Sequence, residues 1–182
     1  MDFKIDDSFF IFNGTVPITW YSKIHDDSII SYLYRISPFF YSISGIVVLI
    51  LNSYLKTHDE YFPWTIFGIL LIFQGLFSYM SDVQYWGQNS YWETFDLYLA
   101  SSLTLIGGPI FILRSIMGYS KYPTKFIFIW FFCVLFALYS KITAKNAIIL
   151  NNIDDFLIWH TIWHCLPVNA TILILLLSFG LL

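Results

Sequence analysis

The stretch FPWTIFGILLIFQGLFSYMSD, residues 62–82, decides the fold of this chain. It carries no charged side chain until Asp82, and it is long enough to cross a bilayer core as a helix, which needs roughly 20 apolar residues. Polar or turn-forming residues separate this stretch from four other apolar stretches. These lie at about 36–55, 94–116, 124–142 and 155–180. The pattern predicts an all-α fold, a polytopic transmembrane helical bundle of about five spans.

The composition supports the same class of protein. The chain is 58% hydrophobic and 12% charged, with a mean hydropathy of +0.68, whereas soluble domains carry about 25% charged residues. We therefore expect a multi-pass integral membrane protein, with an N-terminal interfacial segment over 1–34 and the bundle over 35–182. A net charge of −3 gives no basic field for binding nucleic acid. For a membrane protein of this kind, membrane lipids are the expected partners.

Four ionisable residues are predicted to meet at one membrane face. Successive spans alternate in direction, so the second span ends on the side that holds the N-terminus, which we call side A. The third and fifth spans begin on side A. Asp82 closes the second span, Asp96 opens the third, and His160 and His164 lie in the first turns of the fifth.

These four residues suit a metal site. His160 and His164 are one helical turn apart on one face, a spacing that zinc hydrolases use to bind one ion through two ring nitrogens. Asp82 or Asp96 would supply a third ligand, which leaves a water in the fourth position with a pKa near about 7. The remaining acid would act as general base or would orient the water. Ionisable groups inside a membrane are costly, which favours a functional interpretation.

A plainer alternative exists for each residue. Each histidine can hydrogen-bond a neighbouring helix, and each aspartate can cap a helix or face interfacial water. Ser78 lies one turn before Asp82 on the same face, where it is a candidate oxyanion donor. A serine in a transmembrane helix also commonly bonds its own backbone or a neighbouring helix.

The motifs together resemble the CREST superfamily. This group includes alkaline ceramidases, adiponectin-type receptors, GPI-lipid remodelling proteins and the myomaker-related branch. The resemblance is carried by three short motifs, and the spelling His-x-x-Trp-His is closest to the last two branches. The motifs are Ser78-Tyr79-Met80-Ser81-Asp82, Phe95-Asp96-Leu97 and Trp159-His160-Thr161-Ile162-Trp163-His164.

The resemblance implies an intramembrane zinc site and hydrolysis of lipid amide or ester bonds. Its metal ligands would be His160, His164 and Asp82, with Asp96 and Ser78 as the catalytic residues. Two departures from the family pattern matter: members have histidine in place of Asp82, and they have about seven spans. The aspartate either keeps a zinc ligand of different charge or marks a branch that has lost metal and activity.

A rival interpretation is a non-enzymatic subunit of a larger membrane complex, such as a respiratory assembly. Aromatic residues make up 21% of the chain, and the histidine pair would then serve haem binding or packing. Two histidines one turn apart on one helix cannot be the opposite axial ligands of one haem. The sequence therefore favours a zinc site over a bis-histidine haem site.

Overall fold

The structure of the chain, a computed structural model, describes residues 20–54, 64–86, 90–107, 109, 113 and 124–178. All regular structure in these ranges is helical, with seven α-helices and two π-helical segments. They are α1 (Trp20–Ile24), α2 (Ile29–Ile36), α3 (Phe39–Tyr54), α4 (Trp64–Tyr79), η2 (Met80–Gln84), α5 (Tyr91–Ser102), η3 (Leu103–Gly107), α7 (Thr124–Ile149) and α8 (Ile153–Ser178). The prediction of an all-α fold is confirmed for the described residues.

The number of membrane spans is a separate matter. Two described helices are long and apolar enough to cross a membrane, Trp64–Gln84 and Phe131–Ile149. A third candidate arises if α2 and α3, which meet at an angle of 45°, are taken as one span. The predicted count of about five spans is therefore not confirmed. Residues 1–19 of the predicted interfacial segment lie outside the described residues.

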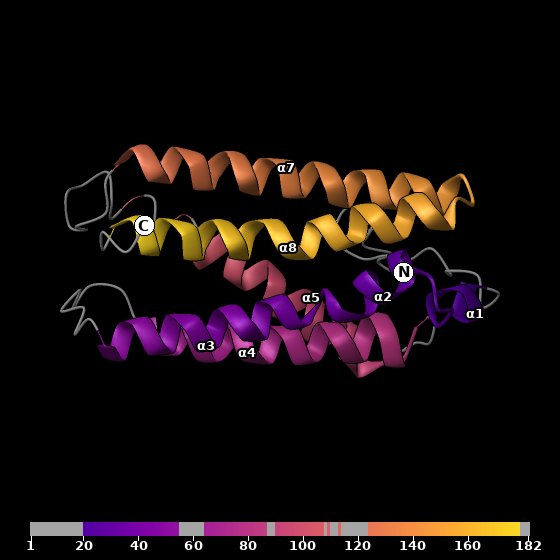
Figure 1. Cartoon of the computed structure of the whole chain (residues 1–182), viewed down its shortest axis with the longest axis horizontal. Helices are drawn as coiled ribbons and strands as arrows, with labels where there is room; N and C mark the ends of the chain where they lie inside the picture. The colour runs from indigo at the N-terminus through magenta and orange to yellow at the C-terminus, as the bar shows by residue number, and fades with distance from the viewer. Residues whose placement is uncertain are drawn as a thin grey trace, which may run out of the picture.

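The long helices form two antiparallel pairs. Figure 1 shows α3 beside α4 and α7 beside α8, with the two pairs joined where α8 packs against α2 and α3. Helix α1, the end of α4 and the α7–α8 turn lie together at the right-hand end of that view. This end is the predicted side A, and α5 packs against α4 and η2 near it.

The bend between α2 and α3 follows from Pro38. Proline lacks the backbone N–H that a continuing helix needs, and its ring collides with the carbonyl of the residue four positions earlier. Helix α2 therefore ends at Ile36, and α3 restarts at Phe39 in a new direction. The bend places Ser37, which is fully buried, against α8.

The tight α7–α8 turn is fixed by two asparagines. Asn151 has a φ of 54°, a left-handed conformation that asparagine tolerates better than most residues. Asn152 caps α8, since its Oδ1 accepts from the backbone N–H of Asp155 and its Nδ2 donates to the Asp155 carboxylate at 2.7 Å. Helix α7 thus extends to Ile149, beyond the predicted end at residue 142.

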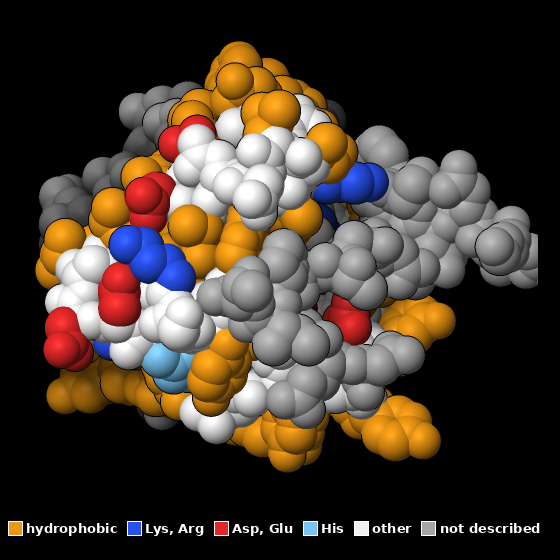
Figure 2. Space-filling model, turned by 90° about the vertical axis from the view of Figure 1, so that its right-hand side faces the viewer, with side chains coloured by type: hydrophobic (Ala, Val, Ile, Leu, Met, Phe, Trp, Pro, Cys, Tyr) orange, Lys and Arg blue, Asp and Glu red, His pale blue; other side chains and the backbone are white. Residues whose placement is uncertain are grey.

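The side-A end combines a charged surface with an aromatic core. Figure 2 looks onto this end and shows acidic and basic side chains together on it. Lys23 forms ion pairs there with Asp26 at 3.3 Å and with Asp154 at 3.8 Å. Beneath this surface lies an apolar cluster drawn from α1, α2, η2 and the turn after it, α7 and α8. It consists of Trp20, Ile24, Tyr34, Val83, Trp86, Ala144, Ala147, Phe156 and Leu157.

Candidate metal centre

Three side chains converge below the apolar cluster that contains Tyr34 and Phe156, at the contact between the two helix pairs. Asp82 comes from η2, and His160 and His164 come from α8. The His160 Nε2 lies 3.1 Å from Asp82 Oδ2 and 3.1 Å from His164 Nε2. The His164 Nε2 lies 3.3 Å from the same Asp82 oxygen. The predicted convergence of Asp82 with the histidine pair is confirmed.

This triangle has the dimensions of a zinc site. Zinc binds imidazole nitrogen at about 2.0–2.1 Å and carboxylate oxygen at about 2.0–2.2 Å in tetrahedral geometry. Those bond lengths place neighbouring ligand atoms roughly 3.3 Å apart, close to the three distances between Asp82, His160 and His164. Three ligands leave the fourth corner of the tetrahedron for water or substrate. The residues therefore fit the metal that the sequence motifs imply.

Ser37 determines which nitrogen of His164 faces the triangle. The Ser37 hydroxyl donates its single hydrogen to the Tyr34 carbonyl oxygen at 2.8 Å. Its oxygen must then accept from His164 Nδ1, which is also at 2.8 Å. A neutral imidazole carries one proton, so the Nε2 of His164 presents a lone pair to Asp82. Two acceptors, Asp82 Oδ2 and His164 Nε2, thus lie 3.3 Å apart, and His160 Nε2 lies 3.1 Å from each, so either a proton on His160 or a bound cation must lie between them.

Buried aromatic rings hold the histidines in place. The ring centroid of His160 lies 5.1 Å from that of Phe156 and 5.5 Å from that of Tyr34. His164 is 2% exposed and packs against the Tyr41 ring. The Tyr34 hydroxyl also donates to the backbone carbonyl of Asp82 at 3.1 Å. Through Tyr34, helix α2 therefore contacts one ligand from each of the two elements that supply them, Asp82 of η2 and His160 of α8.

Asp82 lies in a local widening of its helix. The backbone N–H of Tyr85 bonds to the carbonyl of Met80 at 2.9 Å, five residues earlier. Such π-helical turns are frequent at functional sites, where they redirect one side chain. The sequence placed Asp82 at the end of a span, but it gave no sign of this widening.

Ser78 and Asp96 have distinct positions beside the triangle. The Ser78 hydroxyl donates to Asp82 Oδ2 at 3.2 Å and lies 3.3 Å from His164 Nε2. Asp96, on α5, is not a member of the ligand group, and its Oδ1 accepts from Gln74 Nε2 at 2.6 Å. Of the two acids considered as third ligand, the structure therefore places Asp82 with the histidines.

Three further residues of the site were missed by sequence reasoning: Tyr34, Ser37 and Gln74. Gln74 precedes Ser78 and Asp82 by four and eight residues, so its place on their helical face was legible in the sequence. Tyr34 and Ser37 gave no such signal, because only the bend at Pro38 brings them to α8.

Comparisons with protein-family models, curated proteins and solved structures find no match for this chain. The resemblance to the CREST superfamily therefore rests on the three sequence motifs.

Proposed function

We propose that this chain is a multi-pass membrane protein of about five spans that binds zinc through Asp82, His160 and His164 and hydrolyses a lipid amide or ester bond. The observation that carries the proposal is the ligand triangle, with sides of 3.1, 3.1 and 3.3 Å. The CREST-like motifs supply the reaction class.

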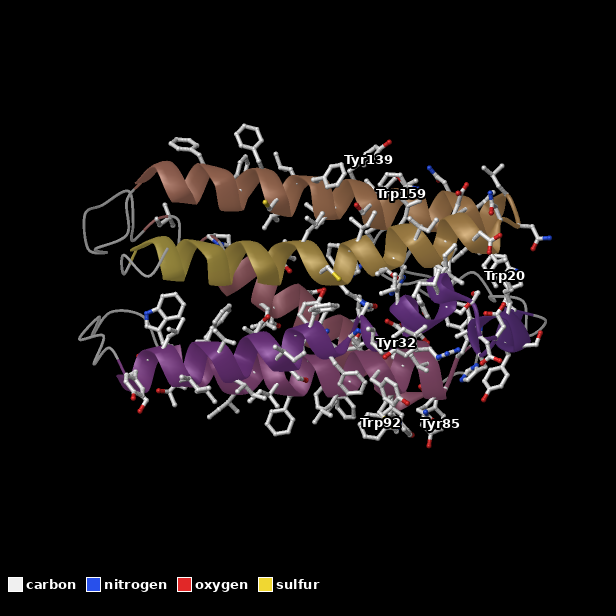
Figure 3. The ribbon with its side chains drawn as sticks, viewed as in Figure 1. Trp20, Tyr32, Tyr85, Trp92, Tyr139 and Trp159 are labelled. Carbon is white, nitrogen blue, oxygen red and sulfur yellow. The ribbon has the colours of Figure 1, made fainter. Side chains whose placement is uncertain are left out.

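The surface of the helices supports a membrane location. Large apolar side chains are exposed along the outer faces of the long helices, including Ile46 and Ile50 on α3 and Phe132 on α7. The tryptophans and tyrosines labelled in Figure 3 come from several elements and lie in the half of the molecule that contains side A. Such rings favour the membrane–water interface. The five spans would be α3, α4, α5 with η3, α7 and α8.

The chemistry divides between the metal and the chain. Bound zinc would lower the pKa of a water in its fourth position and polarise a carbonyl. Asp96 would take the proton of the attacking water and return it to the amine or alcohol that leaves as the amide or ester bond breaks. Ser78 would turn its single hydrogen from Asp82 to the carbonyl oxygen as negative charge develops there. The buried rings around the histidines would exclude bulk water.

Metal analysis tests the site directly. The protein purified in mild detergent should contain about one zinc per chain, because two imidazoles and a carboxylate form a three-ligand site. His160→Ala combined with His164→Ala should remove that zinc. His25→Ala is the matched control, since His25 is exposed and, among the residues that the structure describes, bonds only to Tyr21 in its own turn. Unchanged zinc in the double variant would exclude the site and favour the subunit interpretation.

Activity is the second test. The zinc-loaded protein should release fatty acid from an amide- or ester-linked lipid, and Asp96→Asn should lower kcat about 10²–10⁴-fold while zinc is retained. Ser78→Ala should cost no more than about 10²–10³-fold, the usual effect of one oxyanion donor. Zinc binding without turnover of any lipid in a broad panel would leave a structural or binding role.

A further inference from the structure

Gln74 is a buried amide that is only half satisfied. It is 2% exposed, and its Nε2 donates to Asp96 Oδ1 at 2.6 Å. Its Oε1 is buried and has no hydrogen-bond partner among the described residues. Buried acceptors in native proteins are nearly always paired, so this exception calls for a physical explanation.

The structure shows which end of this amide meets its partner. The NH₂ end of Gln74 faces Asp96, where Nε2 donates to Oδ1. The unpaired atom is the amide oxygen, and what it lacks is a hydrogen-bond donor.

The unpaired oxygen belongs to a polar strip that leads to the metal centre. Gln74, Ser78 and Asp82 are spaced four residues apart, so they follow one another along one face of α4 and η2. Gln74 lies one helical turn, roughly 6 Å, from Ser78, and Asp96 from α5 joins the strip at Gln74. A molecule whose carbonyl lies at the zinc triangle would reach Gln74 within a few bonds.

We infer that Gln74 Oε1 and Asp96 form a subsite for a hydrogen-bond donor of the substrate, a hydroxyl or amide N–H a few bonds from the scissile carbonyl. This inference rests on the proposed function and narrows its substrate to lipids that carry such a donor. A site built to bond a donor rejects analogues that lack it, because its own buried group is then left unpaired.

Equilibrium binding tests the subsite without requiring turnover. The probes are N-oleoylethanolamine and its N-methyl, O-methyl and doubly methylated analogues, bound to the zinc-loaded protein in lipid nanodiscs. The parent should bind the wild type about 10- to 100-fold more tightly than the doubly methylated analogue. The singly methylated pair shows which donor is used. Equal binding of all four by the wild type would overturn the inference.

Two variants locate the effect. Gln74→Met removes the amide at similar length and should bring the binding ratio close to one. Gln84→Met is the matched control, because Gln84 follows in η2 but is exposed and bonds Tyr79; it should keep the wild-type ratio. A wild-type ratio retained in Gln74→Met would also refute the subsite.

Hydrolysis of the same four lipids separates this inference from the proposed function. A binding preference without release of oleate from any of them would support the subsite and argue against an enzyme. Release of oleate from all four at equal rates and with equal affinity would support the hydrolase and exclude the subsite.

Discussion

At the scale of single residues, the site depends on Ser37 as much as on the ligands themselves. A metal-binding histidine usually donates its other ring N–H to a partner that fixes its tautomer and orientation. The Ser37 hydroxyl has this relation to His164 Nδ1 at 2.8 Å, and it is itself anchored to the Tyr34 carbonyl.

Removal of the Ser37 hydroxyl should therefore weaken zinc binding without removing a ligand. Ser37→Ala frees His164 to adopt the other tautomer. Loss of the hydrogen-bond partner of a metal-binding histidine typically lowers metal affinity about 10–100-fold. Zinc affinity measured by competition with a chelator checks the prediction. Ser44→Ala is the control, because Ser44 is an equally buried serine on α3. Equal losses in both variants would mean that only packing is involved.

The ligands could be predicted from the sequence, whereas their supports could not. The spacing of His160 and His164 and the alternation of spans were enough to bring both to the side-A end with Asp82. The separation of Asp96 from the ligand group depends on the rotation of α5 against α4, which no sequence period reports. Ser37 and Tyr34 reach the site only through a tertiary contact between α2 and α8.

At the scale of elements, glycines set the distance between α3 and α4. A Cβ at Gly45 would collide with the backbone oxygen of Gly68, and a Cβ at Gly75 would collide with Ser42 and Pro38. The Ser42 hydroxyl crosses the same interface to the Ile72 carbonyl at 2.9 Å. Small residues and interhelical hydrogen bonds are what hold helices together in lipid, where no hydrophobic force acts between them.

A bulky residue at this crossing should separate the pair. Gly45→Val places side-chain atoms against the Gly68 backbone, which cannot rotate away. We therefore expect the free energy of unfolding to fall by at least about 1–3 kcal/mol, the usual cost of an overpacked site. The thermal unfolding midpoint in detergent should fall. Ser53→Val adds bulk to the same helix at an exposed position and should leave the midpoint nearly unchanged. Matching midpoints for the two variants would contradict the close packing.

The helices could be predicted from the apolar stretches of the sequence, but the bend at Pro38 and the π-helical turn at Met80–Gln84 could not. The stretch predicted as a span over 36–55 is split by Pro38 into the end of α2 and all of α3. The Met80–Gln84 turn is π-helical, and the Tyr34 hydroxyl of another helix donates to the Asp82 carbonyl within it. Local sequence predicts that a helix exists more reliably than how its ends are shaped.

At the scale of the whole molecule, a zinc ion would connect the two helix pairs. Asp82 belongs to the α3–α4 pair and both histidines belong to the α7–α8 pair, so the ligands come from either side of the contact between them. In the metal-free protein that contact includes two acceptors, Asp82 Oδ2 and His164 Nε2, at 3.3 Å. Metal binding would then be linked to the stability of the assembled bundle.

Zinc should accordingly raise the thermal stability of the folded chain in a pH-dependent way. A ligand that binds only the folded state stabilises it by about 2.7 kcal/mol at 100 times its dissociation constant. Zinc needs neutral imidazoles, and the ordinary histidine pKa is about 6.5. Protons compete with zinc more strongly as the pH falls, so the stabilisation should be largest near about pH 8 and should decrease as the solution becomes acidic. Unfolding midpoints with zinc and with a chelator, measured across this range, give the effect as their difference. In the protein carrying His160→Ala and His164→Ala that difference should vanish at every pH, and a difference that persists there would place the stabilising zinc elsewhere in the chain.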